Sequence, residues 1–191
     1  MKLLLIRHGR PERIDHDPNG ADPCLTELGH RQALGMAEYL NDQPLDKIYV
    51  SPQLRAIETA QPLSEVKGLE PVVEPGIAEF DLGHPSYIPG EERAPLVGAE
   101  LETLIAQATA PEFVDRVRAS TTKIIESHPD ETVAAVCHGG VISIILNDIF
   151  DMPLGTYHPA RYTSVSRIHL SPTGKRFMAS FNESHWINGM H

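Results

Sequence analysis

The spacing of apolar positions alternates along the chain between the patterns of strands and of helices. Short apolar runs at 2–6, 47–50 and 132–137 predict buried strands. Another strand is expected at 70–74, kept short by Pro71 and Pro75. Apolar residues at helical spacing predict helices over 26–40, 51–63, 100–108, 112–127 and 141–149. The segments 163–170 and 176–181, joined by a Pro-Thr-Gly turn, predict a closing hairpin.

Two helix starts are marked by their side chains. Thr26 is expected to cap the helix that runs to about Leu40, because its hydroxyl can accept a bond from a free backbone N–H group. Ser51 with Pro52 predicts the next start, with serine at the cap and proline at the first helical position. Residues 76–98 are rich in glycine and proline, so we expect a lid or specificity insertion around 76–110.

Strands that alternate with helices predict an α/β fold, a three-layer α/β/α sandwich with a mostly parallel sheet. The final hairpin supplies an antiparallel edge. A length of 191 residues, without a repeat or linker, indicates a single domain over 1–191. In such sheets ligands bind beyond the carboxyl ends of the strands. Two predicted strands end in a histidine followed by glycine, at His8 and His138, so we expect the site there.

The charge balance limits the partners of the protein. Acidic residues number 26 and basic residues 16, for a net charge of −10, which disfavours binding to nucleic acid or to anionic membranes. An anionic substrate would need arginines gathered in a local pocket. Cys24 and Cys137 are far apart and form no CxxC motif, and the first apolar run is interrupted by Arg7 after five residues. We therefore expect a reducing, cytoplasmic location.

His8 has neighbours that suit phosphate chemistry. Arg7 can offer two N–H groups to a phosphate, and Gly9 lets the backbone approach a ligand closely. Neutral imidazole is a nucleophile that can form a covalent intermediate. The alternative is a polar residue at a strand end, as for most of the ten histidines.

Several motifs, in order along nearly the whole chain, resemble those of the histidine phosphatase superfamily, also called phosphoglycerate mutase-like. A single Arg-His-Gly triplet is weak evidence for the family, whereas the ordered set of motifs is strong evidence. The motifs are Leu5-Ile6-Arg7-His8-Gly9, LTELGHRQA at 25–33, SPQLRAIETA at 51–60, EFDLG at 79–83, His138-Gly139-Gly140, and Asn182-Glu183-Ser184-His185.

The resemblance implies a role for each of the core residues. His8 would be the phosphorylated nucleophile, and Arg7, Arg55 and His138 would surround the phosphoryl oxygens. Glu79 would protonate the leaving oxygen and then activate water, which needs a carboxyl that can hold a proton near the working pH. Other nearby carboxylates are the alternatives for this acid: Glu74, Asp81, Glu91 and Glu92.

The resemblance also bears on the phosphate site and on cofactors. Gly9 and Gly139 would let the backbone approach the phosphate, and the following helix could direct its N-terminus toward it. Several cationic donors in a closed pocket can replace a magnesium ion. We therefore expect neither a metal nor another cofactor.

The loop after the acid favours hydrolysis of a phosphomonoester. It is shorter than in dedicated phosphoglycerate mutases, which must hold the intermediate and exclude water. A mutase-type isomerase and a non-catalytic phospholigand-binding domain remain alternatives. The expected substrate is a phosphorylated small molecule, with a phosphoprotein also open. Arg10 is either a contact for a second anionic group or a surface charge, and three further residues could contact the leaving group: His84, Tyr87 and Arg93.

Overall fold

The fold is built on one mixed sheet. The computed structural model describes residues 1–92, 97–171 and 173–187. Six strands of this part of the chain form the sheet in the order β3-β2-β4-β1-β5-β6. The strands are β1 (Lys2–Arg7), β2 (Lys47–Val50), β3 (Val72–Val73), β4 (Thr132–Cys137), β5 (Val165–Leu170) and β6 (Arg176–Glu183). The first four are parallel, β5 is antiparallel to β1, and β6 is antiparallel to β5, which confirms the predicted sheet.

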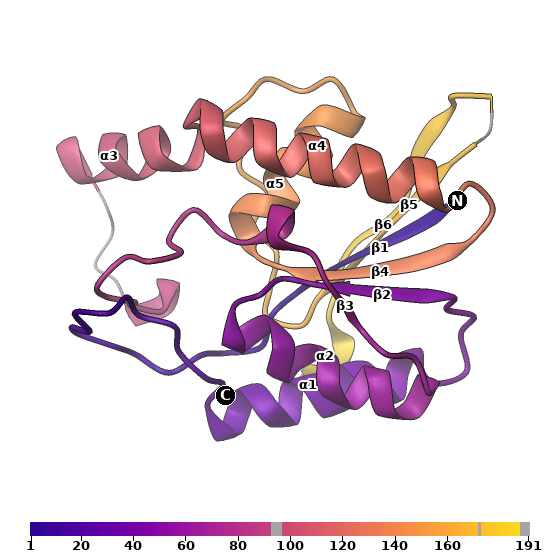
Figure 1. The fold of residues 1–191 in the computed structure, drawn as a ribbon, viewed down its shortest axis with the longest axis horizontal. Helices are drawn as coiled ribbons and strands as arrows, with labels where there is room; N and C mark the ends of the chain where they lie inside the picture. Colours follow the sequence, from indigo (N-terminus) through magenta and orange to yellow (C-terminus); the bar gives the residue numbers. More distant parts are fainter. Residues whose placement is uncertain (93–96, 172, 188–191) are drawn as a thin grey trace.

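Helices cover both faces of the sheet, as Figure 1 shows. One layer holds α1 (Glu27–Leu40) and α2 (Leu54–Lys67), and the other holds α4 (Pro111–Ser127) and α5 (Gly139–Ile149). The shorter α3 (Ala99–Ala108) lies beyond the start of α4, on the same side of the sheet. The molecule is therefore the three-layer sandwich expected from the alternation of strands and helices.

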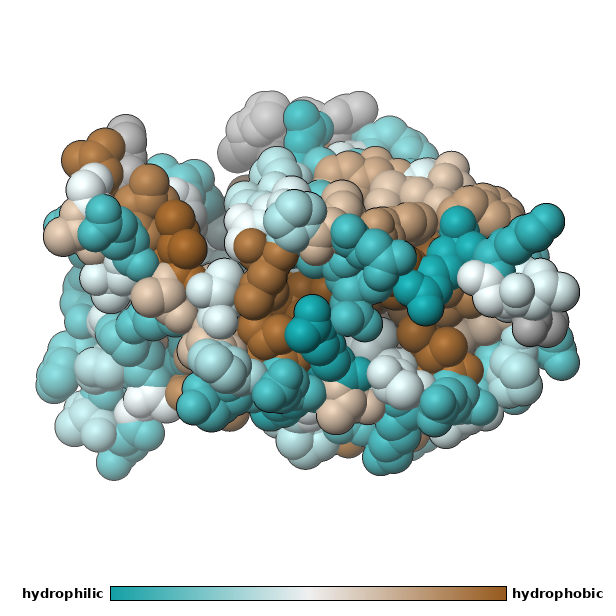
Figure 2. Space-filling model, turned by 90° about the horizontal axis from the view of Figure 1, so that it is seen from above, coloured by the Kyte–Doolittle hydropathy of each residue, from teal (hydrophilic) through white to brown (hydrophobic). Residues whose placement is uncertain are grey.

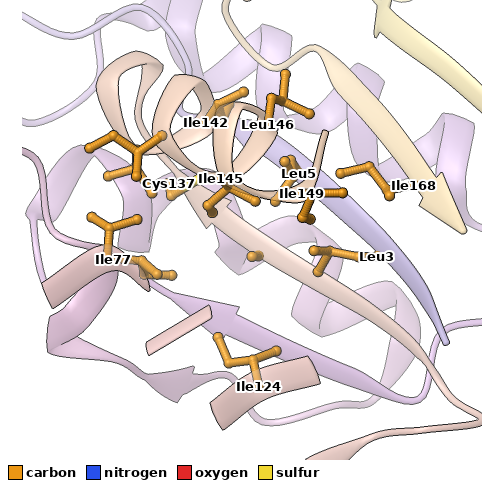
Figure 3. Packing of buried hydrophobic residues seen from close by; sticks show 14 of the residues in the cluster. Leu3, Leu5, Ile77, Ile124, Cys137, Ile142, Ile145, Leu146, Ile149 and Ile168 are labelled. Carbon is orange, nitrogen blue, oxygen red and sulfur yellow. The ribbon is translucent and has the colours of Figure 1, made fainter. Parts of the chain in front are cut away.

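The alternation of side chains along β1 divides the core in two. Leu3 and Leu5 belong to the cluster that packs with α4 and α5, which Figure 3 shows around Ile142. Leu4 and Ile6 belong to the cluster on the side of α1 and α2. Burial of each such side chain stabilises the fold by about 1.5–3 kcal/mol. A central strand that is apolar on both faces thus fixes the position of its end, where Arg7 and His8 follow.

The helix starts agree with the sequence in one case and differ in the other. Thr26 caps α1, accepting a bond from Gly29 N at 2.9 Å. The prediction that Ser51 caps α2 is wrong, because the helix begins at Leu54. The Leu54 N–H group instead donates to the carboxylate of Asp22 at 2.9 and 3.1 Å. The Ser51 hydroxyl is engaged elsewhere, at 2.7 Å from the His138 ring.

The predicted insertion contains little regular structure. Two short 3-10 turns, η1 (Pro75–Ile77) and η2 (Gly90–Glu92), are followed by α3. The expected strand at 70–74 is limited to two residues, Val72 and Val73. Over the described ranges, no helix is long and apolar enough to cross a membrane.

Candidate active site

The two histidine motifs meet because β1 and β4 are neighbouring parallel strands. Arg7 is in register with Cys137, so His8 and His138 leave the sheet side by side at its carboxyl edge. The backbone N–H of His8 donates to Cys137 O at 2.9 Å. The two imidazole rings lie 5.1 Å apart between centroids. The structure thus brings together the two strand ends that the sequence singled out.

The contacts of His8 leave one ring nitrogen available. Its side chain is 2% exposed, and Nδ1 lies 2.7 Å from Gly9 O. A carbonyl can only accept, so Nδ1 carries the proton and Nε2 keeps its lone pair. Burial, and then the charges of Arg55 and Arg7, hold the pKa of His8 well below its usual value. The ring is therefore a neutral nucleophile at neutral pH.

Arg7 and Arg55 present N–H groups that lack a partner. Arg55 lies in the first turn of α2 and is 1% exposed. Its Nη2 pairs with Asp81 at 2.8 and 3.1 Å, while Nε and Nη1 bond to none of the described residues. Arg7 Nη1 donates to Ala160 O at 2.7 Å, and its buried Nε is likewise unpaired in the described part. A buried donor without an acceptor costs about 1–3 kcal/mol, so these groups are suited to an anionic ligand.

His138 is a further donor of this kind. Its Nε2 lies 2.7 Å from Ser51 Oγ, which in turn accepts from Gln53 N at 3.3 Å. Because that oxygen already accepts a bond, its O–H group can donate to Nε2 and leave the ring proton on Nδ1. Nδ1 is buried and unpaired within the described ranges. Burial, with the charge of Arg55 second, keeps the pKa of His138 well below its usual value.

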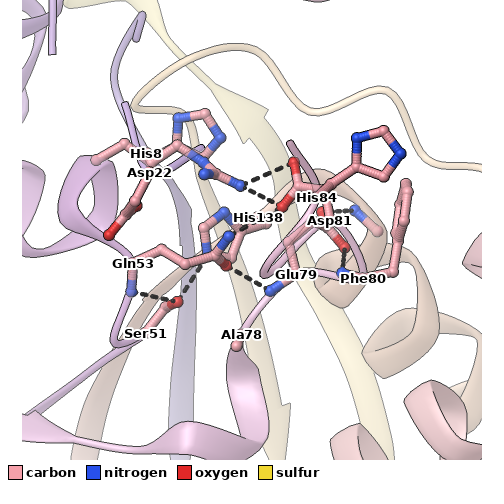
Figure 4. A network of polar contacts seen from close by, with 12 residues as sticks. His8, Asp22, Ser51, Gln53, Ala78, Glu79, Phe80, Asp81, His84 and His138 are labelled. Carbon is pink, nitrogen blue, oxygen red and sulfur yellow. Dashed lines mark hydrogen bonds and ion pairs between the residues drawn. The ribbon is translucent and has the colours of Figure 1, made fainter. Parts of the chain in front are cut away.

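Glu79 lies in the loop after η1, with its carboxylate against the start of α5. Figure 4 shows it in a network with Gln53 and Asp81. Oε2 accepts from Gly140 N at 2.8 Å and Oε1 from Phe80 N at 3.2 Å. Burial, and then the charge of Asp81, raises the pKa of Glu79 to about 7. The group can therefore hold or release a proton near neutral pH.

Two residues that the sequence analysis gave no role hold the loop of Glu79 in place. Gln53 accepts from Glu79 N at 2.7 Å and donates to Asp81 at 2.9 Å. Arg116 of α4 donates to the carbonyls of Pro75, Gly76 and Ala78 at 2.9, 3.0 and 3.0 Å. Gln53 stands inside the quoted SPQLR motif, whereas Arg116 has no signal in the sequence.

The four expected substrate contacts are placed differently from one another. Tyr87 lines the same cavity as His8 and Arg55, and its ring lies 4.6 Å from the Arg55 guanidinium. His84 is exposed and lines a neighbouring cavity instead. Arg10 is outside the lining and pairs with Glu91 at 2.7 Å and Glu92 at 2.6 Å. Arg93 lies outside the described residues.

Glu91 also accepts a bond from the Tyr162 hydroxyl at 2.8 Å, and the Tyr162 ring lies 4.3 Å from the Arg7 guanidinium. η2 is thus tied to Arg10 and, through Tyr162, to Arg7. Of the alternative acids, Glu91 and Glu92 bind Arg10, and Asp81 binds Arg55. Glu74, the remaining alternative, pairs with Lys123 at 3.5 Å. The pKa of Glu79 is raised to about 7, whereas that of Glu91 is lowered, because the effect of burial is outweighed by its hydrogen bonds together with the charge of Arg10.

The cavity around these residues has a volume of about 630 Å³. Its polar end is formed by Arg7, His8, Arg55, Glu79 and the backbone at Gly139 and Gly140. A Cβ at position 140 would lie 2.4 Å from Glu79 Oε1, so glycine here leaves room for the carboxyl in its observed position. In the part of the chain described, no cluster of three or more His, Cys, Asp or Glu has the arrangement of a metal site.

The chain is similar to known proteins in its family, in its sequence and in its fold. A model of the histidine phosphatase superfamily (branch 1) matches residues 3–183. The protein named uncharacterized phosphatase PhoE of Bacillus subtilis is 31% identical over 153 residues, 77% of this chain and 76% of its own. Phosphoserine phosphatase 1 of Hydrogenobacter thermophilus is 31% identical over 149 residues, 72% of this chain and 71% of its own.

A solved structure supports the same assignment. The mycobacterial glucosyl-3-phosphoglycerate phosphatase, in complex with VO3, aligns with a TM-score of 0.75 at 27% identity, over 96% of this chain and 99% of that one. The family match extends over most of the chain and includes every motif that supplies the polar end of the cavity. The chain therefore belongs to the histidine phosphatase superfamily, branch 1.

Proposed function

We propose that the protein hydrolyses phosphomonoesters through a phosphohistidine formed at His8. One observation carries this proposal: Arg7 and Arg55, which line the cavity with the neutral His8, and His138, whose ring lies beside that of His8, each hold a buried nitrogen with no partner among the described residues. Donors fixed in advance around a phosphoryl group stabilise the charge that its oxygens carry in the transition state. Membership of a phosphatase family, and relatives named as phosphatases, support the same reaction.

In the first step His8 Nε2 attacks phosphorus and the bond from phosphorus to the ester oxygen breaks. Glu79, protonated at near-neutral pH by virtue of its raised pKa, gives its proton to the leaving oxygen and an alcohol departs. The charges of Arg7 and Arg55 then neutralise the phosphoryl group on the ring. The His8 Nδ1–H bond to Gly9 O fixes the ring and supports its positive charge.

In the second step the ionised Glu79 removes a proton from water, and the resulting oxygen attacks phosphorus. The bond between Nε2 and phosphorus breaks, His8 regains its lone pair, and inorganic phosphate leaves. Glu79 is again protonated, so the cycle closes without another reactant. The bond from Gly140 N to Glu79 Oε2 keeps the carboxyl in place for both steps.

The substrate under this proposal is a phosphorylated small molecule. A mutase would follow the same first step and then return the phosphoryl group to an acceptor hydroxyl. The two outcomes differ only in what attacks the phosphohistidine. Release of inorganic phosphate in stoichiometric yield separates hydrolysis from transfer.

The test is phosphate release from a panel of phosphomonoesters in EDTA. We expect wild-type turnover that disappears in His8→Ala and is retained in His16→Ala, which replaces an exposed loop histidine. Quenched samples should contain a phosphoenzyme that is labile to acid and stable to alkali. Turnover by His8→Ala, or a phosphoenzyme stable to acid, would contradict the assignment of the nucleophile.

A further inference from the structure

Helix α3 is unusual because its apolar stripe is not covered by the core. Leu101, Leu104, Ile105 and Ala108 follow one another at the spacing of a single helix face. No residue of α3 is buried, and Leu101 and Ile105 are 40% and 47% exposed. Each of the other four α-helices in the described chain buries at least five residues. A ten-residue helix of this kind gains little from propensity alone.

The same stripe forms a wall of the catalytic cavity. All four of its residues line the space that contains His8. Other apolar groups complete this wall: Phe80, Ile88, Ile144, Leu154 and Tyr157. Figure 2 views the molecule from the side of α3 and α4 and shows apolar side chains exposed there. The apolar surface is therefore continuous with the phosphate-binding end.

The cavity offers no second cationic site in its described lining. The cations among its described lining residues are Arg7 and Arg55, which line the cavity together with His8, and each has a buried N–H group without a partner in the described part of the chain. The Asp81 carboxylate pairs with Arg55 Nη2. Arg10, the candidate for a second anionic group, is held by Glu91 and Glu92 outside the lining. Among the described lining residues, a carboxylate on the leaving group would therefore find no positively charged partner other than the two arginines of the phosphate-binding end.

We propose that the preferred substrates are phosphomonoesters of uncharged, apolar alcohols, whose carbon chain or ring packs on the α3 stripe. This inference rests on the proposed function and specifies the substrate class of the same site. Phosphorylated amino acids and sugar acids fit the cavity less well, because they bring a charge to an apolar wall. Transfer of one methylene from water to an apolar surface favours binding by up to about fourfold.

A chain-length series tests the proposal directly. Ethyl, butyl, hexyl and 2-phenylethyl phosphate share an alkanol leaving group, so differences in kcat/KM report contacts made by the carbon chain. We expect kcat/KM to rise at least about tenfold from ethyl to hexyl phosphate. The kcat/KM values for phosphoserine and 3-phosphoglycerate should be lower than the value for hexyl phosphate.

Substitution of the stripe supplies the second measurement. Leu101→Gln with Ile105→Gln keeps good helix formers at exposed positions and should reduce the hexyl-to-ethyl ratio by about fivefold or more. The control is Leu34→Gln, at an apolar position of α1 that is 54% exposed and outside the cavity, and its ratio should match the wild type.

The outcomes separate the two proposals. His8-dependent turnover with a flat chain-length series, or with phosphoserine preferred to hexyl phosphate, overturns the substrate class and leaves the hydrolase intact. A ratio unchanged by the double substitution assigns the selectivity to another wall and overturns the role of α3. Absence of His8-dependent turnover on every ester overturns the proposed function, and the substrate class with it.

Discussion

Replacement of Glu79 by glutamine separates the cost of burying this carboxyl from its use in catalysis. Glu79 is 7% exposed, and its pKa is raised from 4.5 to about 7, chiefly by burial. A carboxyl with a raised pKa binds its proton more tightly in the folded than in the unfolded chain. The stability that this proton contributes is fully present below pH 4.5 and is lost as the pH rises through 7. The loss amounts to about 3 kcal/mol of the free energy of unfolding.

The Glu79→Gln variant has no carboxyl at this position to ionise. Its free energy of unfolding, relative to wild type, should therefore increase by about 2–3 kcal/mol between pH 5 and pH 8. The amide has one acceptor oxygen where the carboxylate has two, so the bond from Gly140 or from Phe80 is lost. That loss costs about 1–3 kcal/mol at every pH and does not change the trend. His8 and His138 also affect the pH dependence, but they are common to both proteins and largely cancel in the difference.

The assay is urea unfolding at pH 5, 6, 7 and 8, with kcat measured on the same preparations. We expect the free energy of unfolding of the variant, relative to wild type, to increase with pH. Its kcat for an alkyl phosphate should be lower than that of the wild type by about 10²–10⁴. Glu126→Gln removes an exposed carboxylate of α4 and is the matched control for both measurements. A stability difference that is flat or decreases with pH would show that Glu79 is not held protonated. Unchanged kcat would assign the proton transfer to a different group.

Three other substitutions test how the site is held together. Gly140→Ala would place a Cβ 2.4 Å from Glu79 Oε1 and should lower kcat at least about tenfold. In the control Gly139→Ala, the new Cβ meets nothing closer than the Tyr157 hydroxyl at 3.4 Å, so kcat should fall less. Ser51→Ala removes the hydroxyl that fixes the His138 tautomer, so kcat/KM should fall by the equivalent of about 1–3 kcal/mol, and Ser51→Thr should restore it. In Arg116→Lys the single ammonium cannot bond to all three carbonyls, so kcat should fall and the Glu79 step in the pH–rate profile should move. The control Arg118→Lys, at an exposed ion pair with Asp148, should change neither quantity. A pH–rate profile unaltered by Arg116→Lys would limit that residue to a structural role.

The sheet could be predicted because its pattern is local. Residues 132–137 form β4 as expected, since a continuous apolar run bounded by polar residues reports burial on both faces. The meeting of His8 and His138 also followed from a general rule, because neighbouring parallel strands present their carboxyl ends at one edge. Sequence patterns succeed where the deciding contacts lie within one element or follow from the topology.

The failures come from contacts between residues far apart in the chain. Ser51 has the local signature of a cap, yet its hydroxyl bonds to His138, 87 positions away. Arg10 could be read as a free cation, but its partner Glu91 lies 81 positions away in η2. Helix α3 carries an apolar stripe typical of a core-facing helix, and only the structure shows that the stripe faces the cavity.

The pKa shifts of the two histidines and of Glu79 have the same physical origin. Burial disfavours charge on any group, so it lowers the pKa of both His8 and His138 and raises that of Glu79. Asp81 pairs with one of the two arginines, Arg55. The pocket therefore meets a dianionic phosphate with fixed positive charge, a neutral nucleophile and a protonated acid, the three states that the first chemical step requires. The low-dielectric surroundings that produce these states also strengthen each contact to the phosphoryl oxygens. Burial of the site thus sets the protonation of the nucleophile and of the acid together.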